Sequence, residues 1–318
     1  MPADRLASRL AGRPASALRR AVLLTGTACT AAACSRLTFL AANAPTVLGV
    51  YDRRTDIPYG TDPLQRLDVY APRGEPSRPR PMIVFWHGGR WESGDKRDYR
   101  FVGAALAQLD CVAVVANYRL YPAVKMPGFM QDAARAALWA CDHASEFGAD
   151  PDALYLMGHS SGAHMGALLA LDSRYFRAAS ASAPRLAGFI GLSGPYDFLP
   201  LREADLQDMF GPPDLYPLSQ PINFVRADAP RMLLVHGESD LTVSPFNASR
   251  LAAALQARGV GVTLRMYPRL GHADTVAALS ELARRRAPVL ADIEQFLRAD
   301  GNARQARADY EHNKGEML

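Results

Sequence analysis

The sequence predicts an α/β architecture with a mainly parallel central sheet flanked by helices. Apolar segments of strand length, rich in β-branched residues, alternate along the chain with segments of helical spacing, which is typical of βαβ units. The composition, 49% hydrophobic and 21% charged over 318 residues, also provides enough apolar side chains for one large core. In such a sheet, functional side chains are expected at the carboxyl ends of the strands.

The individual elements follow from their residue patterns. Residues 66–72 alternate apolar and polar side chains, as in a half-buried strand, whereas residues 82–86 are continuously apolar and suit a strand buried on both faces. Further strands are predicted at residues 112–116, 154–157, 189–192, 232–235 and 262–266. Helical spacing predicts helices at residues 103–109, 127–144, 161–171, 251–258 and 281–297.

Residues 198–229 interrupt this alternation. They contain many Pro and Asp residues and have no clear period, so we predict a small insertion, or cap, within the domain. The folded α/β domain is expected to span residues 59–300. We expect a linker at residues 34–58 before it and a polar, disordered tail at residues 301–318 after it.

The N-terminal segment, residues 1–33, has the pattern of an export signal. Arg19 and Arg20 precede a short apolar run and a series of small residues. The same segment holds five arginines and one aspartate, so it accounts for the whole net charge of +4 and leaves residues 34–318 electrically balanced. Because a nucleic-acid-binding protein needs a basic surface on its folded part, we expect no nucleic-acid partner.

Residues 31–34, Ala-Ala-Ala-Cys, are similar to the end of a bacterial lipoprotein signal. In such proteins the Cys becomes the lipidated first residue, so Cys34 is the candidate lipidation site and would attach the protein to a membrane. Cys29 is an alternative anchor. The predicted localisation is therefore periplasmic or membrane-anchored after export, and the alternative is a cytoplasmic enzyme with an uncleaved N-terminus.

The sequence Gly-His-Ser-Ser-Gly at residues 158–162 matches the pattern G-x-S-x-G where a predicted strand gives way to a predicted helix. A Ser at such a sharp turn has a strained backbone and an exposed hydroxyl, and the flanking glycines allow the strand and the helix to approach closely. The helix N-terminus adds unpaired N–H groups. Ser also caps helices, so the motif alone is weak, but its position predicts Ser160 as a nucleophile.

A Ser nucleophile needs a His to take its proton and a carboxylate to orient that His. In the nucleophile-elbow arrangement the chain order is Ser, acid, His. Asp240 and His272 each follow a predicted strand in that order, so we predict Asp240 as the acid and His272 as the base. Glu238 is the alternative acid. His236 also follows a strand, but no strand-end acid lies between it and Ser160, and we interpret it as structural.

The reaction also requires groups that stabilise an oxyanion. The sequence His-Gly-Gly-Arg-Trp at residues 87–91 follows the buried strand 82–86. Consecutive glycines let backbone N–H groups approach a substrate oxygen without obstruction. We therefore expect the N–H groups of Gly88, Gly89 and Ser161 to form an oxyanion hole.

From about residue 59 to residue 297 the chain resembles an α/β-hydrolase of the esterase branch that includes hormone-sensitive-lipase-like and kynurenine-formamidase-like enzymes. The matching stretches are YGTDPLQRLDVYAP, HGGRW, WESGDK, ANYRLYP, GHSSGAH, SGPYDF, HGESDLTV and GHAD. The chain is especially similar to a group of bacterial lipoprotein-like esterases. The resemblance implies the same nucleophile, acid, base and oxyanion hole. Arg90 departs from the lipase branch, which has a third Gly there, so Arg90 could contribute only its backbone N–H to the hole, and its side chain is expected to shape the mouth of the site.

These motifs predict a serine ester hydrolase that acts through an acyl-enzyme intermediate on small or short-chain acyl esters. No cofactor or metal is expected, since HExxH is absent and no Cys/His cluster has ligand spacing. One alternative is an amide hydrolase of formamidase or peptidase type. The other is a non-catalytic lipoprotein that binds a ligand.

Overall fold

The computed structural model describes residues 39–49, 51–180, 183–299 and 301. The chain divides into an N-terminal unit, Met1–Ala41, and a second unit, Ala42–Leu318. Of the N-terminal unit the structure describes only residues 39–41, which are helical. The sheet and the predicted catalytic and oxyanion-hole residues belong to the second unit.

Several predictions about the chain ends concern residues that lie outside the described part of the chain. These are the predicted signal at residues 1–33 with the candidate anchors Cys29 and Cys34, and the predicted tail apart from residue 301. Residue 301 is helical. No helix of the described part combines enough length with enough apolar character to span a bilayer.

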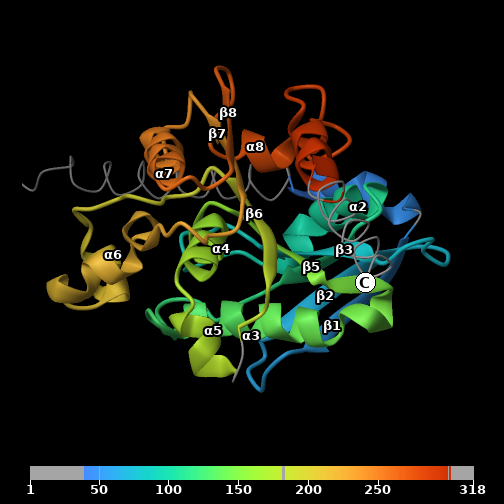
Figure 1. Ribbon diagram of the computed structural model, residues 1–318, viewed down its shortest axis with the longest axis horizontal. Helices are drawn as coiled ribbons and strands as arrows, with labels where there is room; N and C mark the ends of the chain where they lie inside the picture. Colours follow the sequence, from blue (N-terminus) through green and yellow to red (C-terminus); the bar gives the residue numbers. More distant parts are fainter. Residues whose placement is uncertain (1–38, 50, 181–182, 300, 302–318) are drawn as a thin grey trace, which may run out of the picture. The chain divides into compact units, whose positions relative to one another are not determined.

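The second unit contains an eight-stranded sheet with the strand order β1-β2-β4-β3-β5-β6-β7-β8 (Figure 1). The β1–β2 and β2–β4 pairs are antiparallel, and all other neighbours are parallel, so the predicted mainly parallel sheet is confirmed. The strands are β1 (Tyr51–Pro58), β2 (Arg66–Pro72), β3 (Arg80–Trp86), β4 (Val112–Ala116), β5 (Ala149–His159), β6 (Leu186–Leu192), β7 (Met232–Gly237) and β8 (Val262–Tyr267).

The sheet begins earlier in the chain than the sequence predicted. We expected residues 34–58 to be a linker, but β1 lies within them and pairs with β2 from Tyr51, opposite Pro72, to Pro58, opposite Arg66. Most β1 side chains are exposed and polar, so the strand lacks the alternating apolar pattern that marks a half-buried strand. Backbone pairing with β2 forms this edge strand, and the folded domain therefore starts before residue 59.

Helices cover both faces of the sheet. The α-helices are α2 (Arg100–Gln108), α3 (Gly128–Asp142), α4 (Ser161–Leu171), α5 (Arg174–Ala179), α6 (Ala204–Phe210), α7 (Phe246–Ala257), α8 (Asp274–Ala277) and a last helix at residues 289–299. Short 3-10 helices are η1 (Ala44–Leu48), η2 (Lys96–Tyr99), η3 (Ala144–Phe147), η4 (Pro213–Ser219) and η5 (Pro221–Phe224). The predicted insertion at residues 198–229 contains α6, η4 and η5.

Alternate side chains of the central strands face the two helical layers. Val84 and Trp86 of β3 belong to a buried apolar cluster that includes side chains of α3 and α4. On the other face, Tyr155 of β5 contacts Phe296 of the last helix, with ring centroids 6.3 Å apart. Figure 1 shows the sheet between α3, on one side, and α2 with the last helix, drawn in red, on the other. This double burial explains the continuously apolar pattern of β3.

The last helix is shorter than predicted. The sequence pattern indicated a helix over residues 281–297, but residues 281–286 form turns and the helix begins at residue 289. Pro288 directly precedes the first helical residue. Its fixed φ and missing N–H are tolerated at a helix start but not in a helix interior, so the helix begins after it.

A buried ion pair ties the loop after β3 to the sheet. The Nζ of Lys96 in η2 lies 2.6 Å from Oδ1 of Asp68 in β2, and each side chain is only 2% exposed. The Lys96 backbone N–H donates to Asn117 Oδ1, just after β4. Because a buried charge without its partner is costly, these contacts fix the path of the chain that leaves β3 at residue 86.

Candidate active site

Ser160 lies at a sharp turn between β5 and α4. Its backbone has φ 54° and ψ −121°, a conformation that costs a residue with a Cβ about 1–3 kcal/mol. The Ser160 N–H donates to the Leu192 carbonyl at the end of β6. A Cβ on Gly162 would lie 2.0 Å from the Trp86 carbonyl oxygen, so the close approach of α4 to β3 requires Gly there. Local sequence and packing together hold this strained turn.

The structure brings Ser160, His272 and Asp240 into one hydrogen-bonded chain. The distance from Ser160 Oγ to His272 Nε2 is 2.9 Å, and that from His272 Nδ1 to Asp240 Oδ2 is 2.8 Å. The loops after β7 and β8 carry the acid and the imidazole. Because the carboxylate only accepts, Nδ1–H donates to Asp240 and the Nε2 lone pair is free to accept the Ser160 hydroxyl proton.

Glu238, the alternative acid, lies apart from this chain of contacts. Its side chain is exposed, and in the described structure no hydrogen bond or ion pair joins it to His272. The Asp240 side chain is instead fully buried. Its Oδ1 accepts the backbone N–H groups of Thr242 and Val243, each at 2.9 Å. The geometry therefore favours Asp240 over Glu238 as the acid.

The loop after β3 lies directly against Ser160. A Cβ on Gly88 would be 3.0 Å from the Ser160 Cβ. The next three residues have left-handed backbones, with φ 130° at Gly89, 57° at Arg90 and 61° at Trp91. Ser161 is the first residue of α4, so its N–H has no intrahelical acceptor. Two of the predicted oxyanion-hole residues, Gly88 and Ser161, thus lie next to Ser160, and Gly89 follows Gly88 in the same loop.

Arg90 connects this loop to the cap. Its guanidinium forms ion pairs with Glu203 and Asp205 at the start of α6, and Nη2 donates to Asp205 Oδ1 at 3.1 Å. The sequence predicted a backbone contribution from Arg90 to the oxyanion hole and a side chain that shapes the mouth of the site. The side chain connects α6, through its ion pairs with Glu203 and Asp205, to the loop that lies against Ser160.

Aromatic side chains fill the space beneath the cap. Trp91, which is 4% exposed, contacts Phe210 of α6 and His164 of α4, each with ring centroids 5.0 Å apart and planes nearly perpendicular. Phe198 stacks on the same indole ring at 6.0 Å. These contacts give Trp91 a packing role between the loop after β3, α4 and the cap.

Two further histidines lie against the Asp240–His272 pair. His159 Nε2 is 3.1 Å from the His272 carbonyl oxygen, and His236 Nε2 is 3.1 Å from Asp240 Oδ2. The sequence pattern predicted neither contact, and His236 was interpreted as structural. The only sequence feature that could have indicated the contact is that His236 precedes Asp240 by four residues. That spacing brings side chains together on a helix, whereas here a tight turn after β7 does so.

Burial and hydrogen bonding set the charge of this cluster. Burial alone would raise the pKa of the Asp240 carboxyl, but hydrogen bonds from His236, His272 and the Val243 N–H hold that pKa below its ordinary value. Burial and the neighbouring His272 lower the pKa of His159 to about 3, so His159 is neutral at pH 7. Asp240 is therefore ionised at pH 7, where it faces the imidazoles of His272 and His236.

We expect the free energy of unfolding to fall on acidification below the ordinary histidine pKa of 6.5. Burial lowers the pKa of His164 to about 4, so below pH 6.5 the unfolded chain takes up a proton that the folded protein does not. Each such histidine reduces the free energy of unfolding by about 1.4 kcal/mol per pH unit in this window.

Urea unfolding of the wild type and of His164→Gln at several pH values between 7 and 5 measures the slope of the free energy of unfolding against pH. One such histidine contributes about 1.4 kcal/mol per pH unit to that slope. Gln retains an amide donor for the Ser219 carbonyl, which His164 Nε2 contacts at 2.7 Å, but does not titrate. The variant should show the smaller slope. Equal slopes in the wild type and the variant would contradict the lowered pKa of His164.

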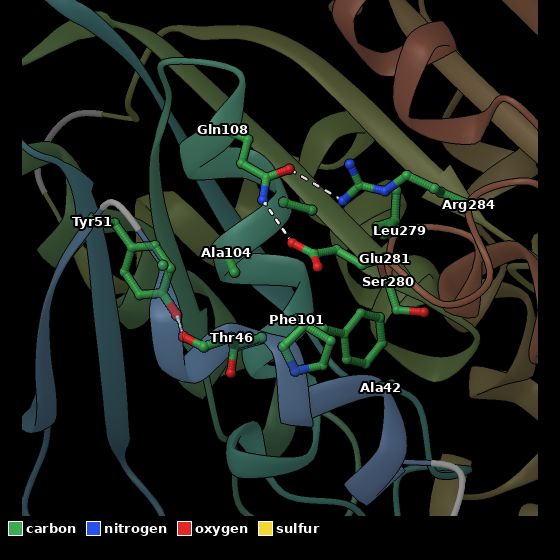
Figure 2. Close-up of a pocket in the computed structure, with 13 residues that line it drawn as sticks. Ala42, Thr46, Tyr51, Phe101, Ala104, Gln108, Leu279, Ser280, Glu281 and Arg284 are labelled. Carbon is green, nitrogen blue, oxygen red and sulfur yellow. Dashed lines mark hydrogen bonds between the residues drawn. The ribbon is translucent and has the colours of Figure 1, made fainter.

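A separate hollow lies between α2 and residues 279–284, and none of the predicted site residues lines it (Figure 2). Arg284 Nη2 donates to Gln108 Oε1 at 3.1 Å, and Gln108 Nε2 contacts Glu281 Oε1 at 3.4 Å. These polar side chains are engaged with one another, so we assign no ligand to the hollow. Among the described residues, no group of three or more His, Cys, Asp or Glu is arranged to bind a metal ion.

The parallel sheet, the strand–helix turn at Ser160 and the acid and imidazole on successive post-strand loops define an α/β-hydrolase. The sequence profile of the BD-FAE family matches residues 67–255, and the chain belongs to this family of α/β-hydrolase esterases.

Curated relatives agree with this family. The chain is 28% identical over 242 residues to the isoprenylcysteine α-carbonyl methylesterase ICME of Arabidopsis thaliana, covering 70% of this chain and 56% of the relative. It is 28% identical over 264 residues to the esterase LipQ of Mycobacterium tuberculosis, covering 74% and 62%. The chain thus spans about half to three fifths of the length of these relatives.

Solved structures share the fold. Esterase B of Lactobacillus rhamnosis superposes with a TM-score of 0.71 at 20% identity, covering 91% of this chain and 99% of that one. Esterase 2 of Thermogutta terrifontis superposes with a TM-score of 0.67 at 24% identity, covering 79% and 95%. The predicted fold class is confirmed by both.

Proposed function

We propose that the protein is a serine ester hydrolase in which Ser160 is the nucleophile, His272 the base and Asp240 the acid. The observation that carries this proposal is the hydrogen-bonded chain from Asp240 through His272 to Ser160. Ser160 Oγ attacks the acyl carbonyl carbon while His272 Nε2 takes its proton and returns it to the leaving alcohol. Water then attacks the acyl-enzyme, His272 again moves the proton, and the acid leaves with Ser160 restored.

The oxyanion of each tetrahedral intermediate needs donors that are already in place. The backbone N–H groups of Gly88, Gly89 and Ser161 are proposed to supply them. The closeness of Gly88 to Ser160 and the position of Ser161 at the start of α4 support this assignment. The same loop is connected to the start of α6 by ion pairs from Arg90 to Glu203 and Asp205.

Labelling with a fluorophosphonate probe tests the proposed function directly. The probe reacts with an activated Ser, and peptide mass spectrometry then identifies the modified residue. We expect modification at Ser160. A protein that remains unlabelled under conditions where a known serine esterase is labelled would instead favour the non-catalytic, ligand-binding alternative.

Gly88→Ala is expected to lower kcat by about 10²–10³-fold, the usual effect of losing one oxyanion donor. The new Cβ would lie 2.8 Å from His159 Nδ1 and 3.0 Å from the Ser160 Cβ, so the loop must shift away from the nucleophile. Steady-state kinetics with a p-nitrophenyl ester measures the loss. Gly261→Ala is the matched control, because that glycine is exposed and its added Cβ would meet only Arg231 Cβ at 3.8 Å, and a comparable loss there would refute the interpretation.

The substrates are proposed to be small or short-chain acyl esters. The cap contributes only one short α-helix, α6, and aromatic rings fill the space beneath it. A p-nitrophenyl ester series should show the highest kcat/KM for short acyl chains, and formamides should react more slowly than esters. A maximum at long chains would contradict the proposal.

Export and lipid attachment at Cys34 are also proposed. The support is the sequence before Cys34, which combines Arg19 and Arg20 with an apolar run and small residues. Mass spectrometry of the mature N-terminus in a bacterial host should find a lipidated Cys34. Cys34→Ala should abolish the modification, whereas modification that depends on Cys29 would transfer the assignment to that residue.

A further inference from the structure

His236 occupies the end of β7 and is completely buried. Its Nε2 lies 3.0 Å from the Val243 carbonyl oxygen, to which it is hydrogen-bonded, and 3.1 Å from Asp240 Oδ2. Both neighbours are acceptors, so the proton of the imidazole must be on Nε2. The Nδ1 atom is buried without a partner in the described structure, which is compatible with a lone pair there but costly for a second N–H.

The same turn holds Asp240 through its other oxygen. Oδ1 accepts the N–H groups of Thr242 and Val243, while Oδ2 receives His272 Nδ1 at 2.8 Å. His236 Nε2 lies within hydrogen-bonding distance of both Oδ2 and the Val243 carbonyl oxygen, so its N–H adds a second donor at Oδ2 beside His272. Removing the donor would leave the Val243 carbonyl without this hydrogen bond and Oδ2 with His272 alone, so Asp240 would be held less firmly in its orientation.

We propose that His236 is a positioning residue for the reaction: its Nε2–H, shared between the Asp240 carboxylate and the Val243 carbonyl, holds the acid in the orientation that receives the Nδ1–H of His272. The donor also draws charge from Oδ2. Without it the carboxylate attracts the proton on His272 more strongly, and the base becomes protonated at higher pH. This inference rests on the proposed function for its kinetic consequences, but not for its geometry.

The kinetic test compares His236→Gln with His236→Met, two side chains of similar shape. Gln can place an amide N–H near the position of Nε2, whereas Met has no donor. We expect Met to lower kcat about tenfold with little change in KM, because ester binding does not use this turn. We also expect it to raise the midpoint of the acid limb of kcat/KM by roughly half a pH unit. The Gln variant should keep the wild-type midpoint and recover part of kcat.

The pH comparison is controlled by what both variants retain. His272 still faces Asp240 and His159, and its own loop still carries the ion pair between Asp274 and Arg286. The two variants therefore differ near His272 only in the donor at position 236. Identical pH midpoints in the Met variant, the Gln variant and the wild type would overturn the proposal, and so would equal shifts in both variants.

A second measurement needs neither activity nor the Met variant to fold. Long-range ¹H–¹⁵N NMR of histidine-labelled wild type at neutral pH reports which ring nitrogen carries the proton, and the signals of His236 are identified by their loss in His236→Gln. The proposal requires the proton on Nε2. A proton on Nδ1 would exclude donation to Asp240 and overturn it. An inactive wild type with the proton on Nε2 would refute the proposed function while leaving this geometry intact.

Discussion

Ser160→Ala is expected to lower kcat for an ester by about a million-fold, as when the nucleophile of a serine protease is removed. Nothing else at the turn can replace the lost oxygen: the Ser161 hydroxyl is directed to Tyr118, 3.3 Å away, and only the Ser160 Oγ lies at 2.9 Å from His272 Nε2 among the contacts described. The backbone strain at position 160 is the same for Ala as for Ser, so the fold should persist.

The measurement combines ester turnover, fluorophosphonate labelling and thermal unfolding of the purified variant. Ser239→Ala is a suitable control, because that exposed hydroxyl donates to the Pro268 carbonyl and lies next to Asp240 without joining the hydrogen-bonded chain. We expect it to retain turnover within a few-fold. Labelling of Ser160→Ala at the wild-type level would show that another residue is the nucleophile.

Asp240→Asn is expected to lower kcat by about 10⁴-fold with the fold intact. The reason lies in the partners of the two side-chain oxygens. The N–H groups of Thr242 and Val243 require an acceptor, so the Asn oxygen must occupy the Oδ1 position and the amide NH₂ must face His272. His272 Nδ1 would then accept, its proton would move to Nε2, and Nε2 could no longer take the proton of Ser160.

Steady-state kinetics and circular dichroism of Asp240→Asn test this expectation, with Glu238→Gln as the matched control. The Glu238 side chain is exposed, so its conversion to an amide should change kcat by less than about threefold, in line with the small effects of most surface substitutions. A severe loss in Glu238→Gln with an active Asp240→Asn would reverse the assignment of the acid.

The elements predicted most accurately are those whose pattern is local and strong. The strand at residues 66–72, the strand at residues 112–116 and the helix at residues 161–171 are found with the predicted bounds. The first alternates apolar and polar residues, the second is continuously apolar because both of its faces are buried, and the third is buried on all sides directly after the G-x-S-x-G turn. The strand β1 was not predicted, because it is held by backbone pairing with β2 and not by burial of its own side chains.

By itself, the sequence determined the α/β fold class and the residue types offered at the carboxyl ends of the strands, because apolar periodicity and the G-x-S-x-G turn are written in neighbouring residues. Only the tertiary structure decided which of these residues meet. Ser160 and His272 are 112 positions apart, and their contact depends on the order of β5, β6, β7 and β8 in the sheet. The tertiary structure also selected Asp240 over Glu238, because Asp240 is buried against His272 whereas Glu238, two residues earlier in the same turn, is exposed. It likewise placed His236 beside Asp240.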